Sequence, residues 1–311
     1  MNITIFNYSC LSVILLAAPI FAAPSTTGDT TTATYCVIDL SAGANASSYP
    51  VTYLEKEPTG GFNVDEYQTT KLVLKRIEAG SFTRWDNKVK DTVTLTKPFF
   101  LGLFEMTQKQ YQLVTGSNPS DCSGDKRPVE TVNYDAIRGS SNGAKWPASN
   151  AVDADSFLGK LRARTGLDFD LPTEAQWEYA CRAGTTTLYS YGNSAIYGEK
   201  YMWYDVNSWT QTHEVGGLKP NPWGLYDMHG NVWEWCLDYY VNRISRNGTW
   251  DPKGPSSGEA RNGKRGEYRV QRGGCFVNSA FKCSSESRDF EESSFEYGST
   301  CGFRLSLPLD Q

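Results

Sequence analysis

The stretch Asn221-Pro-Trp-Gly-Leu-Tyr-Asp-Met-His-Gly-Asn-Val-Trp-Glu-Trp-Cys236 is the most informative segment of this chain. It places carboxylates at Asp227 and Glu234, on either side of Gly230. Calcium in proteins takes about six to eight oxygen ligands and readily combines carboxylates with backbone carbonyls. A turn that begins at Asp227 and continues into a strand at Glu234 can supply both kinds of oxygen. The competing interpretation is a tight turn that leads into an aromatic core strand, and spacing alone does not separate the two.

Length and composition indicate a soluble globular protein. The 311 residues allow one large domain or two small ones, and a chain of this size buries enough surface to fold without added crosslinks. The net charge of −5 argues against nucleic acid or an anionic membrane as a partner. Aromatic residues are frequent, with 18 Tyr, 14 Phe and 9 Trp. Such rings fill the core of a loop-rich fold more often than they line a groove.

The first 23 residues have the composition of a secretory signal peptide. Residues 1–22 carry no charged side chain, and the apolar run Leu11–Ile20 precedes alanines at 22 and 23. This run is too short to span a bilayer but fits the apolar part of a cleaved signal peptide. Residues 24–34 are rich in Thr and are predicted to form a flexible linker. The protein is therefore expected to be secreted or periplasmic, with no membrane span.

Export makes disulfides possible. Eight cysteines less Cys10, which lies in the signal segment, leave seven, so at least one thiol stays free or pairs between chains. No Cys-x-x-Cys occurs, which removes the usual zinc and dithiol signatures. Only His213 and His229 are available as imidazole ligands. Both lie in turn-rich segments, where a histidine is usually solvated.

Hydrophobic periodicity predicts strands first, helices next, and strands again at the end of the chain. Early strands are expected at Leu72–Ile77, Gly80–Phe82 and Thr92–Thr96, and closing strands at Arg272–Val277 and Gly302–Leu307. Helices are expected from Thr107 to Val114, from near Asn150 to Gly166, and from the capping box Thr173-Glu-Ala-Gln176 to Gly184. Residues 35–69 are interpreted as a strand-poor extension of unknown role, and residues 185–272 as turn-rich. This order indicates an α+β fold.

Six segments, in order along the chain, resemble the formylglycine-generating enzyme family, also called the sulfatase-modifying factor family. They are Val93–Phe99, Phe104–Gln108, Leu171–Gly184, Gly224–Trp235, Arg272–Gly274 and Gly302–Arg304. The resemblance covers about residues 70–307, which we take as the domain. It implies a loop-rich variant of the C-type-lectin fold, with few helices and short antiparallel strands.

The resemblance also implies a structural calcium site in the opening segment. Asp227 and Glu234 would donate side-chain oxygens, and Gly230 and Val232 would donate backbone carbonyls. This favours the calcium interpretation over a plain turn.

The same comparison bears on the cysteines. Family members that oxidise a sulfatase cysteine to formylglycine resemble one another in a Cys-x4-Cys pair after Arg-Gly-Gly, and that pair binds copper(I). Here Cys275 follows the glycines directly, and Asn278 stands in place of the first active cysteine. The copper pair is not reproduced, so a copper cofactor is doubtful and Cys275 and Cys283 are weak catalytic candidates. The resemblance instead implies a disulfide between Cys181 and Cys283.

Three functions remain open after this comparison. One is a binding domain for a peptide, a protein client or a glycan; another is an oxidase or other protein-modifying enzyme with divergent active cysteines; the third is a structural domain of the cell surface. Catalysis needs an activated group, and none is visible, whereas binding needs only shaped loops and aromatic rings. The sequence therefore favours a calcium-stabilised binding domain and leaves enzymatic activity undecided.

Overall fold

The computed structural model describes residues 25–86, 89–244, 249–259, 265–295 and 298–309, so the predicted signal peptide lies outside the described residues. Its helices are α1 (Asp65–Thr69), α2 (Gln108–Thr115), α3 (Tyr134–Arg138), α4 (Phe157–Thr165) and α5 (Glu174–Arg182), with short 3₁₀ turns at Gly143–Lys145, Ala195–Lys200 and Ala280–Cys283. Its strands are β1 (Thr26–Thr27), β2 (Tyr35–Asp39), β3 (Val51–Leu54), β4 (Lys71–Ile77), β5 (Gly80–Asp86), β6 (Val89–Leu95), β7 (Phe99–Gly102), β8 (Trp233–Tyr239), β9 (Gly258–Glu259), β10 (Arg265–Gly266), β11 (Tyr268–Arg272), β12 (Arg288–Glu292), β13 (Cys301–Gly302) and β14 (Ser306–Pro308).

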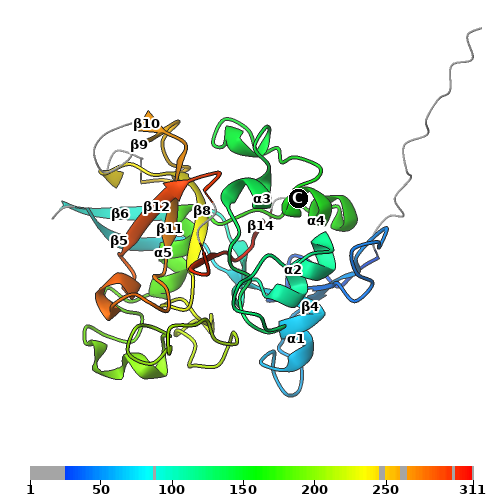
Figure 1. Ribbon diagram of the computed structural model, residues 1–311, viewed down its shortest axis with the longest axis horizontal. Helices are drawn as coiled ribbons and strands as arrows, with labels where there is room; N and C mark the ends of the chain where they lie inside the picture. Colours follow the sequence, from blue (N-terminus) through cyan, green and yellow to red (C-terminus); the bar gives the residue numbers. More distant parts are fainter. Residues whose placement is uncertain (1–24, 87–88, 245–248, 260–264, 296–297, 310–311) are drawn as a thin grey trace, which may run out of the picture.

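Two sheets organise the described chain. One has six strands in the order β1-β3-β2-β4-β7-β14, and the other has four in the order β12-β11-β8-β13. Most neighbours are antiparallel, but β1 with β3 and β13 with β8 are parallel pairs. The predicted α+β class with few helices and short strands is confirmed, with long irregular segments between the elements (Figure 1).

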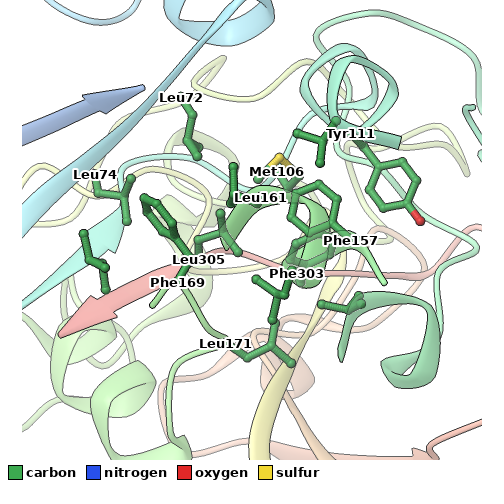
Figure 2. Close-up of a cluster of buried hydrophobic side chains, with 14 of the residues drawn as sticks. Leu72, Leu74, Met106, Tyr111, Phe157, Leu161, Phe169, Leu171, Phe303 and Leu305 are labelled. Atoms are coloured by element: carbon green, nitrogen blue, oxygen red, sulfur yellow. The ribbon is translucent and has the colours of Figure 1, made fainter. Parts of the chain in front are cut away.

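The larger sheet packs against α2 and α4 to form a hydrophobic core (Figure 2). Leu72 and Leu74 point into this core from β4 because alternate residues of a strand face the same side. The ring of Tyr111 on α2 stacks on Phe157 of α4, with centroids 5.1 Å apart. Phe157 in turn meets Phe303 edge-on at 5.2 Å. The segment after Gly302 therefore closes the core between the sheet and the two helices.

Residues 35–69 are an integral part of this sheet, which corrects their interpretation as a strand-poor extension. Strand β2 lies between β3 and β4 and pairs with both, and Cys36 and Ile38 are fully buried. All but one of the five residues of β2 are buried, so its sequence lacks the alternation typical of a half-buried strand. The predicted linker also differs, because Thr26 and Thr27 form β1 against β3.

The helix predictions were right where capping decides the boundary. Thr107 and Thr173 cap α2 and α5, and each forms the reciprocal capping box with the glutamine three residues later. The start of α4 was wrong: the helix begins at Phe157, not near Asn150, because Ser156 supplies the cap by accepting the Gly159 N–H.

The four-stranded sheet positions the segments that the sequence analysis singled out. All seven residues of β8 are buried, and β8 lies between β11 and β13. Because β8 and β11 are antiparallel, with Glu234 opposite Arg272, the loop before β8 and the loop after β11 meet at one end of the sheet. The Gly230 N–H donates to the Gly273 carbonyl at 2.8 Å and joins the two loops directly.

Candidate functional site

The loop from Asp227 to Val232 is a tightly constrained turn. Asp227, Gly230 and Asn231 all have left-handed backbone conformations, with φ of 56°, 81° and 62°. Glycine is required at 230, because a Cβ atom there would lie 2.0 Å from the Trp203 carbonyl oxygen. That carbonyl instead accepts the Asn231 N–H at 2.8 Å. The turn is therefore fixed by close backbone contacts before it enters β8.

At the base of this turn, the Glu234 carboxylate is completely buried and fully engaged. It forms a bidentate pair with Arg304, with Nε to Oε2 at 2.6 Å and Nη2 to Oε1 at 2.7 Å. The indole Nε1 of Trp177 on α5 also donates to Oε2, at 2.8 Å. Glu234 thus ties β8 to α5 and to the closing segment after β13.

Glu105 is a buried member of this site that the sequence analysis did not assign. Its carboxylate accepts the Asn231 side-chain amide at 2.6 Å and the Val232 N–H at 3.2 Å. Burial, followed by the charges of Asp227 and Glu234, raises the pKa of Glu105 well above its usual range. The sequence feature that could have identified Glu105 is its position as the single charged residue in the run Phe99–Gln108.

Asp227 completes a group of three buried carboxylates around one arginine. Its Oδ2 atom accepts the Gly216 N–H at 2.7 Å, and burial raises its pKa to about 6. Arg304 lowers the pKa of both Asp227 and Glu105, while Glu234 raises both. With all three carboxylates ionised, the group carries more negative charge than Arg304 balances, and a bound cation would offset the excess.

Two carboxylates of this group, Asp227 and Glu234, belong to the predicted calcium site, and both Glu234 oxygens already accept hydrogen bonds from Arg304. In the ranges that the structure describes, no group of three or more His, Cys, Asp or Glu side chains is arranged to hold a metal ion. The predicted site, however, takes two of its four ligands from the main chain. Among the described residues, the carbonyls of Gly230 and Val232 accept no backbone hydrogen bond. The assignment of Asp227, Gly230, Val232 and Glu234 to calcium stays a prediction.

Downstream of β11, Asn278 fixes the turn that contains Cys275. Its side-chain oxygen accepts both the Cys275 N–H at 3.0 Å and the Cys275 thiol at 3.2 Å. The Cys283 sulfur lies 4.0 Å from the Cys275 carbonyl oxygen, so the two cysteines are neighbours. Burial raises the pKa of Cys275 to about 12, and it raises that of Cys283 as well. Both thiols are therefore protonated near neutral pH, which makes them poor nucleophiles.

His229 is buried, which corrects its interpretation as a solvated loop histidine. Its Nδ1 donates to the Cys283 carbonyl at 2.7 Å, and its Nε2 accepts the Ser190 N–H at 3.1 Å. Burial lowers the pKa of His229 to about 4, so the ring is neutral near pH 7. The Cys181 sulfur lies 3.9 Å from Nε2. His229 thus connects Cys181 with the Cys283 backbone, a role that follows from long-range packing and has no local sequence signal.

The structure holds Cys181 and Cys283 as separate buried thiols, and the other five cysteines beyond the predicted signal peptide are also unpaired, with Cys122 partly exposed and the rest buried. The disulfide that the family resemblance implied stays a prediction. His213 is half-buried and stacks on Trp203, with ring centroids 3.8 Å apart.

Glu174 and Glu178 on α5 have structural roles. Glu174 pairs with Arg272 at 3.0 Å and with Arg288 at 2.5 Å. Glu178 pairs with Arg182 at 2.7 Å and also with Arg272. This buried network fixes α5 against β11 and the start of β12.

Beside Cys275, two adjacent loops carry a group of exposed apolar side chains that we call the Trp209 patch. Its members are Val206, Trp209, Val277 and Phe281. Trp209 is 82% exposed and Phe281 is 66% exposed. The loops are held together by the Ser208 hydroxyl, which donates to the Phe276 carbonyl at 2.6 Å, and by a backbone bond from Asp205 to Asn278 at 3.0 Å.

The fold and the order of these segments along the chain define a sulfatase-modifying factor domain. The chain belongs to this family: residues 62–307 match the family described as Sulfatase-modifying factor enzyme 1-like domain. It is 32% identical over 223 residues to "Chaperone protein LppX" of Paenibacillus barcinonensis, covering 58% of this chain and 78% of that protein. It is 36% identical over 191 residues to the formylglycine-generating enzyme of Mus musculus, covering 58% of this chain and 50% of that enzyme.

Solved structures agree with this assignment. Treponema denticola variable protein 1 is similar with a TM-score of 0.63 at 29% identity, covering 77% of this chain and 96% of that one. PvdO from Pseudomonas aeruginosa has the same fold, with a TM-score of 0.59 at 21% identity over 76% of this chain and 94% of that one. The predicted family and fold are confirmed. Within the described residues, no helix is both long and apolar enough to cross a membrane.

Proposed function

We propose that this protein is an exported, calcium-stabilised binding domain that holds a peptide segment of a protein partner on the Trp209 patch. In this proposal, the patch is the binding surface and the turn around Asp227 and Glu234 is the calcium site that rigidifies the adjoining loops. The domain lacks the copper-cysteine oxidase pair. Export rests on the signal-peptide composition of residues 1–23.

The observation that carries the proposal is the exposure of large apolar side chains on two loops that are held together. Exposed apolar groups of this kind mark interaction sites, and tryptophan is the residue type that most often dominates binding energy. Val206 and Val277 favour a peptide over a glycan, because aliphatic side chains offer a sugar neither a stacking face nor a hydrogen bond. The similarity to a protein named as a chaperone also supports a protein partner.

The binding proposal can be tested with an unfolded probe, fluorescein-labelled and carboxymethylated α-lactalbumin, by fluorescence anisotropy. We expect Trp209→Ala and Phe281→Ala each to weaken binding by about tenfold, as loss of a central anchor does. Trp250→Ala is the matched control, since Trp250 is 70% exposed but lies outside the patch. The peptide site on the patch would be contradicted if all three variants bound the probe with equal affinity. It would also be contradicted if the wild type bound glycans on an array more tightly than it bound the probe.

Calcium binding can be tested by thermal unfolding with and without chelator. A ligand that binds only the native state stabilises it by about 2.7 kcal/mol when its free concentration is about 100 times Kd. We expect a chelator to lower the Tm of the wild type but not that of Asp227→Ala. Asp205→Ala removes an exposed carboxylate from a neighbouring loop and should keep the calcium response. A wild-type Tm that is indifferent to chelator would rule out this role for calcium.

The alternative is an oxidase or other protein-modifying enzyme with divergent cysteines. The observation in its favour is the proximity of Cys283 to Cys275. Its test is incubation with copper(I), oxygen and a peptide that contains Cys-x-Pro-x-Arg, followed by mass spectrometry. We expect no aldehyde, because both thiols are buried and protonated. An aldehyde that disappears in Cys275→Ala or Cys283→Ala would establish the enzymatic alternative.

A further inference from the structure

A cavity that the proposed function does not use lies where the end of β4 meets α5 and the loop before β8. It has a volume of about 330 Å³ and is lined by residues 75–78, Tyr179, Pro222 and Trp223. Its described lining includes no residue of the Trp209 patch and no predicted calcium ligand. Small-molecule sites have volumes of about 300–1,000 Å³, so this cavity suits a ligand of modest size.

One wall of the cavity is an aromatic pair that the fold holds in place. The rings of Tyr179 and Trp223 meet edge to face, with centroids 4.8 Å apart. Tyr179 is buried, and its hydroxyl donates to the Glu78 carbonyl at 3.2 Å. The wall is therefore fixed relative to the end of β4 before any ligand binds.

Asn221 fixes the turn that carries Trp223. Its side-chain amide donates to the Ala180 carbonyl of α5 at 2.7 Å. Its side-chain oxygen accepts the N–H groups of Trp223 at 3.0 Å and Leu225 at 3.1 Å. Because Asn221 is buried, these hydrogen bonds are shielded from water and tie the turn firmly to α5.

Lys75 brings an unpaired ammonium to this cavity. Its side chain is half-buried on β4, and its Nζ lies 5.6 Å from the centroid of the Tyr35 ring. Gly224 passes close by, since a Cβ atom at that position would lie 3.3 Å from Nζ. In the part of the chain that the structure describes, the Lys75 ammonium forms no hydrogen bond and no ion pair. A partly buried ammonium without an acceptor is costly, and an anionic ligand would supply one.

The other charges around the cavity are already engaged. Arg76 pairs with Glu78, with Nε to Oε1 at 2.8 Å. Glu57 acts on Lys75 from a distance, and its Oε1 atom accepts the Phe62 N–H at 3.3 Å. Burial lowers the pKa of Lys75 by more than the charge of Glu57 raises it. The lining therefore has room for one additional negative charge, beside Lys75.

We propose that this cavity binds a small organic monocarboxylate with an aromatic or branched apolar body. The carboxylate would accept hydrogen bonds from the Lys75 ammonium, which offers three donors, and such charge-assisted bonds are among the stronger ones in proteins. The apolar body would lie against Tyr179 and Trp223, since aromatic rings combine a large apolar area with a defined shape. A single unpaired cation matches one negative charge and leaves a phosphate dianion unbalanced. A free acid and the C-terminus of a peptide share this chemistry.

A ligand-observed NMR titration of the protein with 3-phenylpropionate tests the proposal. We expect saturable binding that weakens by about tenfold or more in Lys75→Met, which keeps an unbranched apolar side chain but removes the charge. Lys160→Met is the matched control, because Lys160 is also half-buried but lies on α4, and it should bind like the wild type. Equal affinity in Lys75→Met and the wild type would overturn the proposal.

Urea unfolding shows whether Lys75→Met is a sound variant. Because the ammonium has no partner among the described residues, its removal should leave the protein at least as stable as the wild type. A clear loss of stability would show that the protein itself already uses this charge, and that result would also overturn the proposal.

Three further measurements complete the test. The neutral isostere 3-phenylpropionamide should bind more weakly than the acid, and equal binding of the two by the wild type would contradict a role for charge. Acetyl-Ala-Ala-Phe with a free C-terminus distinguishes the two sources of the ligand, since tighter binding than 3-phenylpropionate indicates a peptide and weaker binding a free acid. Trp223→Ala should weaken binding of the acid, whereas Trp209→Ala should not, so failure at this cavity and failure at the Trp209 patch give different results. Absence of saturable binding by both carboxylates would overturn the proposal.

Discussion

At the scale of single residues, the Glu234 carboxylate receives its donors from two separate parts of the chain. Arg304 pairs with both of its oxygens, and Trp177 donates to one of them. Glu234→Gln would remove the carboxylate that pairs directly with the buried Arg304 guanidinium, and breaking a buried pair costs about 3–5 kcal/mol of unfolding free energy. Urea unfolding of the variant measures this loss.

The matched control for Glu234 is Glu78→Gln. Glu78 also pairs with an arginine, Arg76 at 2.8 Å, but its side chain is 71% exposed. An exposed pair contributes about 1 kcal/mol or less, because water solvates both charges when the pair is lost. If the two variants lose similar stability, the buried carboxylate is not what holds the base of the turn.

His229 makes stability depend on pH. Its folded pKa of about 4 lies below the ordinary value of 6.5, so the unfolded state binds more protons between these two values. Stability should therefore fall as pH decreases from about 6.5, by roughly 2–3 kcal/mol at pH 4.5. His229→Gln cannot take up this proton and should lose less stability over the same window. Parallel pH profiles for the two proteins would show that His229 does not contribute.

At the scale of secondary-structure elements, α5 depends on its N-terminal cap. The Thr173 hydroxyl accepts the Gln176 N–H at 3.2 Å, and the Gln176 side chain accepts the Thr173 N–H at 2.9 Å. Thr173→Ala should cost about 1 kcal/mol, because the helix loses the acceptor for an early N–H. Thr173→Ser keeps the hydroxyl and should retain most of the stability in the same urea titration. A serine variant as unstable as the alanine variant would assign the loss to the methyl group instead.

This contrast between local and long-range signals explains what the sequence could predict. The caps at Thr107 and Thr173 depend on residues three positions away, so both helix starts were identified correctly. The burial of Glu105 depends on Asn231, more than a hundred residues away in the sequence, and that of His229 depends on Cys283, about fifty residues away. No local sequence pattern predicts such contacts. The family resemblance predicted the fold, because six short segments occur in the family's order along the chain. It did not predict the Trp209 patch, because the residues of the patch lie outside those segments.

At the scale of the whole molecule, the limits of the folding unit differ from those predicted. The domain was expected to begin at residue 70, and the family match begins at residue 62. Strand β2 nevertheless lies inside the six-stranded sheet, with β3 on one side and β4 on the other. Removal of residues 25–70 would expose one edge of β4 and uncover the side of the core that Cys36, Ile38 and Tyr49 now fill. Loss of so many buried apolar side chains exceeds the about 5–15 kcal/mol of stability that a folded protein has.

A protein that begins at Lys71 should therefore fail to fold cooperatively, whereas one that begins at Thr31 should fold. The shorter deletion removes β1, whose two residues are exposed and pair only with β3. Because exposed residues at a sheet edge contribute little burial, we expect this deletion to cost no more than about 1 kcal/mol. Circular dichroism and urea unfolding of both proteins, compared with one that begins at Ser25, measure the difference. A cooperative transition in the protein that begins at Lys71 would place the first two long strands outside the folding unit, as the sequence alone had indicated.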